Sequence, residues 1–371
     1  MVRPLGKPAA CAGLLLLAGP LAMVNAGPSD EDLARKFFRA LIPKKTPIGI
    51  VVGVVRRGGG EVYVLGDVKF DGRTLFEIGS VTKVFTSLAL ATMVVEGKVG
   101  LDDPIRKYLP DNVSPPTRNS KQIRLVHLAT HTSGLPRLPP NMPAWLTVLT
   151  YGNPYASFDL KRLYTAVGQV KLETEPGAKC AYSNFGAGLL GQLLANAAET
   201  DYDSLVKQRI CKPLGMTHTM VHLSDDAKAD LAPACLRYGK KAANWDLAAL
   251  AGAGALKSNV RDLMIFVREH LWPTHEKLAK AVELTIKKRH AAPPVGEIGL
   301  AWHFTEANKV EICWHNGGTG GYSSFVGFVR SAGLGVVVLG NADFHDGLTL
   351  ASFKHVNALV EERRQEGHAP D

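Results

Sequence analysis

Several features that would place the chain in a common class are absent from its 371 residues. It has only five cysteines, and no two have the Cys-x-x-Cys spacing typical of zinc sites. No stripe of basic residues with interleaved aromatics accompanies the formal net charge of +9, which argues against a nucleic-acid surface. The scattered positive charge fits anionic cell-wall polymers or carboxylate substrates better. The length predicts one large folded domain or two closely packed ones, and a hydrophobic content of 46% is ordinary for a globular protein.

Familiar catalytic motifs are missing as well. The Gly-x-Ser-x-Gly elbow of the α/β-hydrolases does not occur. His127 and His131 are four residues apart, but Leu128 stands where a zinc protease needs glutamate, so we interpret both as structural and expect no metal. The glycine-rich segment 317–321 lacks the Lys-Ser/Thr ending of a phosphate loop. We therefore expect no cofactor.

The only long apolar run lies at the N-terminus. Arg3 and Lys7 precede an almost wholly apolar stretch, residues 9–24, and Val24-Asn25-Ala26 offers small residues for cleavage. This pattern is typical of a secretory signal peptide covering residues 1–26, with an uncleaved membrane anchor as the alternative. We expect a periplasmic or secreted protein that begins near Gly27.

Export bears on the remaining cysteines, because an oxidising compartment can pair them. Four cysteines allow three sets of disulfide pairings, and the sequence does not decide which set forms or whether any disulfide forms. They are Cys180, Cys211, Cys235 and Cys313.

Hydrophobic periodicity predicts strands at both ends of the chain and helices between them. Residues 100–240 look mainly helical, whereas glycine-rich turns separate short β-branched runs elsewhere. The pattern predicts an α+β fold, with a sheet domain formed by residues 27–78 and 241–371 and a helical domain formed by 79–240. The expected elements are helices over 30–41, 80–96 and 349–364, and strands over 48–55, 61–65, 309–315, 323–330 and 335–340.

Three short motifs can carry chemistry. The first is Ser80-Val81-Thr82-Lys83, in which residues three apart on a helix bring the Ser80 hydroxyl to the Lys83 amine. A serine needs such a partner, because its hydroxyl is a weak nucleophile at neutral pH. Ser80 also begins the predicted helix, where free N–H groups favour developing negative charge. Alone, this spacing also occurs by chance.

The second motif, Tyr182-Ser183-Asn184, follows a Pro-Gly turn and precedes an apolar helix. Tyr182 can act as a general base if nearby cations lower its pKa from about 10. Asn184 can donate and accept hydrogen bonds at once, which suits a substrate amide. The structural alternative makes Tyr182 a core-edge residue and Asn184 a helix cap.

The third motif runs from Trp314 through His315 and Asn316 to four glycines interrupted by Thr319. It ends a predicted strand, where glycines let another backbone approach closely, as a substrate pairing along a sheet edge would. The alternative is a flexible hairpin turn.

Together the three motifs resemble those of the penicillin-recognising serine hydrolases, which include class C β-lactamases and D-alanyl-D-alanine peptidases. Within that group, residues 125–137 and 181–195 look most like the periplasmic D-alanyl-D-alanine carboxypeptidase/endopeptidases. The resemblance spans about residues 30–362. Further matching stretches are Phe76 to Ser80, Leu128 to Pro136, Pro213 to Met216, Ala251 to Asp262 and Gly299 to Trp302.

The resemblance implies a fold and roles. The fold would be β-lactamase/transpeptidase-like, with an antiparallel five-stranded-type sheet flanked by N- and C-terminal helices and a helical insertion. Ser80 would be the nucleophile, Lys83 would tune proton transfer and Tyr182 would be the base. Asn184 would orient the substrate amide, and the backbone N–H groups of Ser80 and Gly318 would form the oxyanion hole. His315, Gly317 and Gly318 would contact substrate.

One residue departs from the β-lactamase pattern. His315 stands where those enzymes have lysine, and an unperturbed histidine titrates near 6.5 whereas lysine stays charged. Weaker, pH-dependent anchoring of a substrate carboxylate, and hence poor β-lactam turnover, is the expected consequence.

These observations predict an exported serine hydrolase that acts on β-lactams or D-alanyl peptides of peptidoglycan type through an acyl-Ser80 intermediate. Two alternatives stay open: an esterase of the same fold acting on short-chain esters, and a catalytically weak penicillin-binding or scaffold protein. The sequence does not give the oligomeric state.

Overall fold

The structure is a computed structural model that describes residues 29–142, 152–344 and 346–365. The predicted signal peptide lies outside these ranges. Within them, no helix combines the length and the apolar character needed to cross a bilayer. The α-helices are α1 (Asp30–Phe38), α2 (Thr82–Val95), α3 (Leu125–Ala129), α4 (Leu160–Gln169), α5 (Asn184–Ala197), α6 (Tyr202–Val206), α7 (Lys212–Leu214), α8 (Asp225–Ala229), α9 (Val260–Leu271), α10 (Glu276–Ile286) and α11 (Asp346–Gln365).

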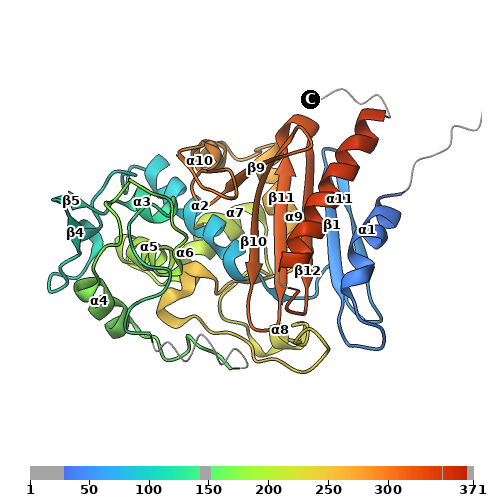
Figure 1. Ribbon diagram of the computed structural model, residues 1–371, viewed down its shortest axis with the longest axis horizontal. Helices are drawn as coiled ribbons and strands as arrows, with labels where there is room; N and C mark the ends of the chain where they lie inside the picture. The colour runs from blue at the N-terminus through green and yellow to red at the C-terminus, as the bar shows by residue number, and fades with distance from the viewer. Residues whose placement is uncertain (1–28, 143–151, 345, 366–371) are drawn as a thin grey trace, which may run out of the picture.

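The strands form one large antiparallel sheet in the order β2-β1-β12-β11-β10-β9-β8-β7. Two further two-stranded sheets pair β3 with β6 and β4 with β5. Figure 1 shows the large sheet between the terminal helices and the helical part of the molecule. The strands are β1 (Ile50–Arg56), β2 (Gly59–Leu65), β3 (Phe76–Glu77), β4 (Thr117–Arg118), β5 (Lys121–Gln122), β6 (Lys257–Ser258), β7 (His290–Ala291), β8 (Glu297–Ile298), β9 (His303–Ala307), β10 (Val310–Gly318), β11 (Ser323–Val329) and β12 (Leu334–Gly340).

Both faces of the sheet are covered, which explains why its central strands are continuous apolar runs. Along β1, Val52 and Val54 pack toward α1 and α11, whereas Val51 and Val55 belong to the larger core on the opposite face. The helix α9 packs against β1 and β12 from that second side. Alternate side chains of one strand therefore serve two different cores.

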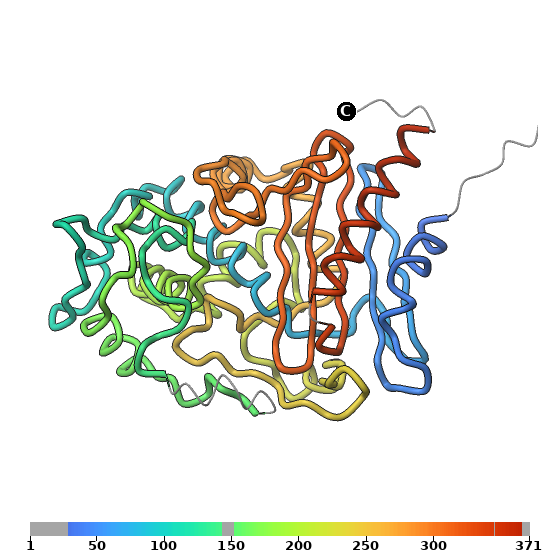
Figure 2. The backbone as a smooth tube through the Cα atoms, viewed as in Figure 1, coloured from blue at the N-terminus to red at the C-terminus, as the bar shows by residue number. Residues whose placement is uncertain are grey.

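The two ends of the chain meet in this sheet. In Figure 2 the blue N-terminal and red C-terminal segments run side by side, and the register pairs Ile50 of β1 with Gly340 of β12. The helices α1 and α11 also pack together. Residues 27–78 and 241–371 thus contribute to the same sheet.

The intervening segment, 79–240, holds the helices α2 to α8 and the β4–β5 pair. The chain before this segment is tied to the chain after it, because Ile78 N donates to Leu256 O at 3.0 Å and Phe76 pairs with Ser258. The helix α2 is apolar on every side and is almost wholly buried, as expected for a core helix. Whether this segment is a separate domain stays a prediction.

The individual strands and helices expected from the sequence are confirmed, with small shifts at their ends. The expectation that residues 100–240 are mainly helical is wrong, because the helices there are short and loops make up most of the described part of the segment. The sheet is larger than the five strands implied by the resemblance, because β9, β8 and β7 extend it beyond β10. Two of these three have only two residues, too few for a period-2 pattern to indicate them.

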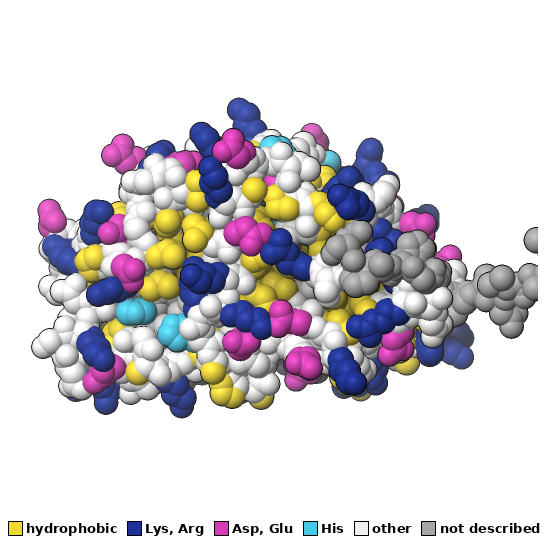
Figure 3. All heavy atoms as spheres, turned by 90° about the horizontal axis from the view of Figure 1, so that it is seen from above, with side chains coloured by type: hydrophobic (Ala, Val, Ile, Leu, Met, Phe, Trp, Pro, Cys, Tyr) yellow, Lys and Arg dark blue, Asp and Glu magenta, His cyan; other side chains and the backbone are white. Residues whose placement is uncertain are grey.

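The surface carries mixed charge. Figure 3 shows basic and acidic side chains interspersed over the face seen from above, with apolar patches between them. This face does not present the one-sign field that a nucleic-acid partner needs.

Candidate active site

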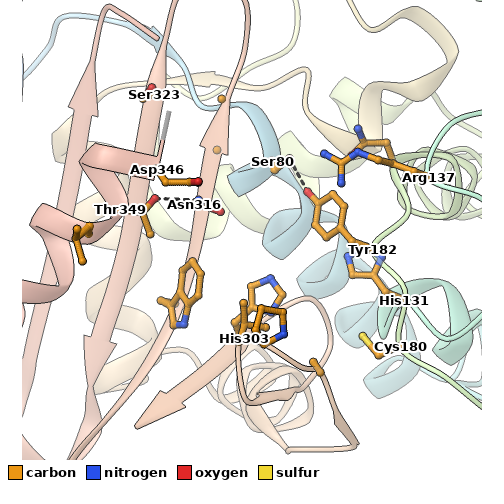
Figure 4. A pocket seen from close by; sticks show the side chains of 18 of the residues that line it. Ser80, His131, Arg137, Cys180, Tyr182, His303, Asn316, Ser323, Asp346 and Thr349 are labelled. Carbon is orange, nitrogen blue, oxygen red and sulfur yellow. Dashed lines mark hydrogen bonds between the residues drawn. The ribbon is translucent and has the colours of Figure 1, made fainter. Parts of the chain in front are cut away.

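A cavity of about 770 Å³ lies where the three sequence motifs converge. Figure 4 shows Ser80 between the strand that carries Asn316 and the segment that carries Tyr182. The walls come from the end of β10, the start of α2, the start of α5 and the start of α11. Its lining residues include Ser80, Arg137, Tyr182, Asn184, Asn316, Gly317, Gly318, Asp343 and Asp346.

Ser80 lies in the short 3-10 turn Gly79–Val81 that leads into α2. Gly79 has φ +50°, and a Cβ there would lie 2.7 Å from the backbone N of Gly318. Glycine therefore permits both the left-handed turn and the close approach of β10. The consequence is a half-buried Ser80 at the helix start, directly beside the third motif.

The Ser80 hydroxyl oxygen accepts hydrogen bonds from two side chains. Lys83 Nζ donates to Ser80 Oγ at 2.9 Å, and Tyr182 OH donates to it at 2.7 Å. Lys83 Nζ also donates to the carbonyl of Ala253 at 2.6 Å, which fixes the amine in place. A hydroxyl, an amine and a phenol thus meet at one point, although their residues are up to 102 positions apart.

Lys83 is 1% exposed and has no acidic partner among the described residues. Burial, and secondarily the charge of Arg137, hold the pKa of its amine well below the usual 10.5. Lowering the pKa of an amine increases the fraction that carries a free lone pair at a given pH. Lys83 is therefore equipped to accept a proton.

Tyr182 behaves differently from the sequence-based expectation. Burial raises its pKa to about 12, although the hydrogen bond to Ser80 and the charge of Arg137 both act to lower it. The condition under which Tyr182 would act as a base, a pKa lowered by nearby cations, is not met in the free protein, because desolvation outweighs them. In the free protein Tyr182 is a neutral phenol that donates a hydrogen bond.

The end of β10 presents an open edge to Ser80. On one side β10 pairs with β11 up to Gly318, but on the other side its pairing with β9 ends at Trp314. The edge beyond Trp314 faces the Ser80 turn, where a Cβ on Gly317 would come within 2.1 Å of Ile78 O. Ser324 Oγ donates a hydrogen bond to the Ile78 carbonyl at 2.7 Å. A substrate backbone can pair along such an edge.

Asn184 is the first residue of α5 and lines the cavity. The helix cap is Ser183, whose Oγ accepts from Gly186 N at 2.9 Å, so Asn184 is not the cap. Its Oδ1 is buried and has no partner within the described part of the chain. A hydrogen bond joins the Asn184 side chain to Tyr155, so among the described residues the carbonyl oxygen is the part of this amide that has no partner.

His315 requires a correction. Its side chain is 1% exposed and does not line the cavity. Its Nδ1–H donates to Asn316 O at 2.6 Å, and burial together with neighbouring His303 and Lys83 holds its pKa well below 6.5. The expectation of a substrate-facing imidazole that titrates near 6.5 is wrong, because His315 is a buried neutral side chain.

Sequence reasoning missed the charged rim of this cavity. The Arg137 guanidinium lies 5.0 Å from the centre of the Tyr182 ring, and the Arg137 carbonyl accepts from Asn184 N at 2.9 Å. Asp343 and Asp346 line the other side, next to α11. Arg137 is the last residue of the matched stretch 125–137, which was a usable signal, whereas the two aspartates lie outside the matched stretches.

The remaining predictions concern cysteines and metals. All four cysteines of the described chain are free thiols, and Cys180 lines the cavity. Across residues 29–142, 152–344 and 346–365, no group of three or more metal-ligating side chains is placed to hold an ion. His127 instead accepts from Arg124 N at 3.2 Å, within the first turn of α3.

Comparisons with known proteins agree with the three motifs. The profile of the family described as Beta-lactamase matches residues 35–355. The D-alanyl-D-alanine-carboxypeptidase/endopeptidase AmpH of Escherichia coli (strain K12) is 31% identical over 299 residues, which cover 77% of this chain and 75% of that protein. A Beta-lactamase of Pseudomonas fluorescens is 26% identical over 346 residues, with 82% and 91% covered.

Solved structures confirm the predicted fold. A class C beta lactamase from Rhodobacter sphaeroides superposes with a TM-score of 0.75 at 22% identity, covering 88% of this chain and 99% of that one. D-alanine Carboxypeptidase AmpC from Burkholderia cenocepacia gives a TM-score of 0.72 at 25% identity, with 89% and 100% covered. The α+β architecture is β-lactamase/transpeptidase-like.

Proposed function

The chain belongs to the Beta-lactamase family, and on that basis we propose that it is an exported serine hydrolase that forms an acyl-enzyme on Ser80. One observation carries the proposal: Ser80 Oγ accepts hydrogen bonds from both Lys83 Nζ and Tyr182 OH at the wall of a substrate-sized cavity. A serine, a base and a third group within hydrogen-bond reach are the signature of an activated nucleophile.

Acylation begins at the amine. Because the pKa of Lys83 is lowered and that of Tyr182 is raised, the amine is the stronger candidate for the resting base. As Ser80 Oγ bonds to the substrate carbonyl carbon, its proton passes to Lys83. The negative charge on the carbonyl oxygen then meets the backbone N–H groups of Ser80 and Gly318, which we propose as the oxyanion hole.

Collapse of this intermediate breaks the bond to the leaving group. Tyr182 gives its phenolic proton to the departing nitrogen or oxygen and regains one from the Lys83 ammonium. The net result is transfer of the Ser80 proton to the leaving group. In deacylation water yields a proton through Tyr182 to Lys83, attacks the ester, and Ser80 Oγ leaves with the proton from Lys83.

We propose D-alanyl peptides rather than β-lactams as the preferred substrates. The E. coli relative at 31% identity is a D-alanyl-D-alanine-carboxypeptidase/endopeptidase by name. The buried, neutral His315 also does not place a cation beside the β10 edge, where β-lactamases have lysine. A β-lactam carboxylate would therefore lack a cationic partner there, as would the terminal carboxylate of a D-Ala-D-Ala peptide, so the preference for peptides rests on the relative.

A side-by-side assay of the mature protein tests the proposal. The substrates are a D-Ala-D-Ala peptide, a chromogenic cephalosporin and a short-chain nitrophenyl ester, with Ser80→Ala as the control. We expect peptide hydrolysis to lead and to fall by about 10⁴-fold or more in Ser80→Ala. Fast ester turnover alone would favour the esterase alternative, and no labelling of Ser80 by a fluorophosphonate would favour a scaffold.

Export itself rests on residues 1–26, and we propose a periplasmic or secreted location. A fusion of residues 1–40 to a reporter that is active only outside the cytoplasm tests this. Reporter activity that survives Leu14→Arg would contradict a signal-peptide mechanism.

A further inference from the structure

The charged groups around the catalytic cavity are unevenly placed. Arg137 is the only arginine or lysine among the described residues that line it, since Lys83 lies beneath the cavity wall. Burial lowers the pKa of the two lining histidines, His131 and His303, so both are neutral at pH 7. The cavity therefore has a single fixed positive charge.

Arg137 is exposed, and no described residue forms an ion pair or side-chain hydrogen bond with its guanidinium. Its planar group instead lies over the Tyr182 ring, 5.0 Å from the centroid. Five N–H donors in a planar fork match a carboxylate, and stacking on an aromatic ring orients that fork. Figure 4 shows the guanidinium at the cavity, on the Tyr182 side of Ser80.

The backbone around Arg137 is fixed to the catalytic elements. Its carbonyl accepts from Asn184 N at 2.9 Å and from Phe185 N at 3.2 Å, at the first turn of α5. The same turn carries the Asn184 amide, which we assign to the amide of the substrate's acyl portion. Arg137 is thus next to the acyl portion, and its charge lowers the pKa of both Lys83 and Tyr182.

The opposite rim repels anions. Asp343 and Asp346 line the cavity on the α11 side, and Figure 4 places Asp346 beside Asn316 and Thr349, across Ser80 from Arg137. Two carboxylates on this side disfavour a substrate carboxylate there. Among the described lining residues, Arg137 alone offers a fixed positive charge to a negative group.

We propose that Arg137 is a specificity-determining residue that binds a carboxylate on the acyl portion of the substrate. The inference rests on the proposed function, because it assumes that Ser80 is acylated. It deepens that function by naming the substrate class: D-alanyl compounds whose acyl portion carries a side-chain or terminal carboxylate, in addition to any carboxylate on the leaving group.

Two pairs of synthetic substrates test this. The first pair is the p-nitrophenyl ester of N-succinyl-D-alanine and its succinyl methyl ester, which differ by one carboxylate on the acyl side. The second pair is N-butyryl-D-alanine thioesters of mercaptoacetate and of methyl mercaptoacetate, which differ by one carboxylate on the leaving group. The kcat/KM ratio within each pair is compared for wild type, Arg137→Gln, Arg137→Lys and Arg137→Glu.

For the wild type we expect the succinyl substrate to be preferred about five- to tenfold, as one charge-assisted contact at a partly exposed site allows. Arg137→Gln should abolish the preference, Arg137→Lys should keep part of it, and Arg137→Glu should reverse it. The control is Arg35→Gln, the same charge change on the exposed face of α1, which should leave the ratio unchanged.

An unchanged ratio in Arg137→Gln would overturn the inference, as would an Arg137-dependent ratio confined to the leaving-group pair. Labelling of Ser80 by a fluorophosphonate is measured in the same samples. Labelled protein with an unchanged ratio refutes only the role of Arg137. Wild-type protein that is neither labelled nor active refutes the proposed function, and this inference with it.

Discussion

Replacing Gly317 by alanine should test the close approach of β10 to the Ser80 turn independently of the other features of the site. A Cβ at this position would lie 2.1 Å from Ile78 O and 2.9 Å from Ser80 N, both of them backbone atoms. Neighbouring Gly318 is a matched control, because its added Cβ would meet nothing closer than Tyr322 O at 3.8 Å. Both glycines line the same cavity.

The magnitude follows from the displacement. Relieving the contact with Ile78 O to 3.0 Å requires β10 and the Ser80 turn to separate by about 0.9 Å. A misplacement of about 1 Å in a catalytic site costs about 100-fold in rate. Overpacking also costs about 1–3 kcal/mol of unfolding free energy. We therefore expect Gly317→Ala to lose about 100-fold in Ser80 acylation and Gly318→Ala to lose only a few-fold.

The assay is the second-order rate of labelling by a fluorophosphonate, with thermal unfolding to confirm that both variants are folded. Labelling measures acylation alone, so slow deacylation does not mask the effect. Gly317→Ala that labels as fast as wild type would refute the reasoning. So would Gly318→Ala that is impaired as much as its neighbour.

Further predictions concern titratable groups. Tyr182→Phe, which removes the hydrogen bond to Ser80, should lower kcat/KM for a D-alanyl peptide about 10²- to 10⁴-fold, and wild-type turnover by this variant would contradict proton donation. Lys83→Arg keeps a basic side chain that cannot lose its proton, so acylation should be lost at every pH between about 6 and 9. In wild type, activity should fall as pH falls, because protonation removes the Lys83 lone pair; a flat profile would count against it. Burial lowers the pKa of His303 to about 4. The unfolded chain therefore binds more protons between about pH 6.5 and 4, and stability should fall across this window by up to about 3 kcal/mol from this group. In urea unfolding, His303→Gln should weaken the pH dependence of the unfolding free energy, and an unchanged pH dependence would show that other groups cause it.

The sequence predicted the parts of the fold and site that depend on local patterns. The β1–β2 hairpin, the core helix α2 and the meander of β10 to β12 follow from hydrophobic periodicity and glycine turns. The Ser80–Lys83 contact follows from helical spacing, and the confirmed 2.9 Å distance is its direct outcome. The resemblance added Tyr182, which no spacing rule connects to Ser80.

Burial and long-range packing decided the rest. The resemblance puts His315 at the lysine position of the β-lactamases, but packing against His303 buries it, which no single-sequence pattern reveals. The pKa of Tyr182 depends on desolvation that only the assembled site creates. Arg137 and Asp346 come from loops and helix ends 209 positions apart, so their opposition across Ser80 was not predictable.

Intact-mass analysis of the mature protein with a slowly hydrolysed penicillin addresses the nucleophile without reference to rate. The protein should gain the mass of one intact penicillin, peptide mapping should place it on the segment that contains Ser80, and Ser80→Ala should gain nothing. An adduct on another residue, or the same adduct in Ser80→Ala, would show that a different group attacks the carbonyl.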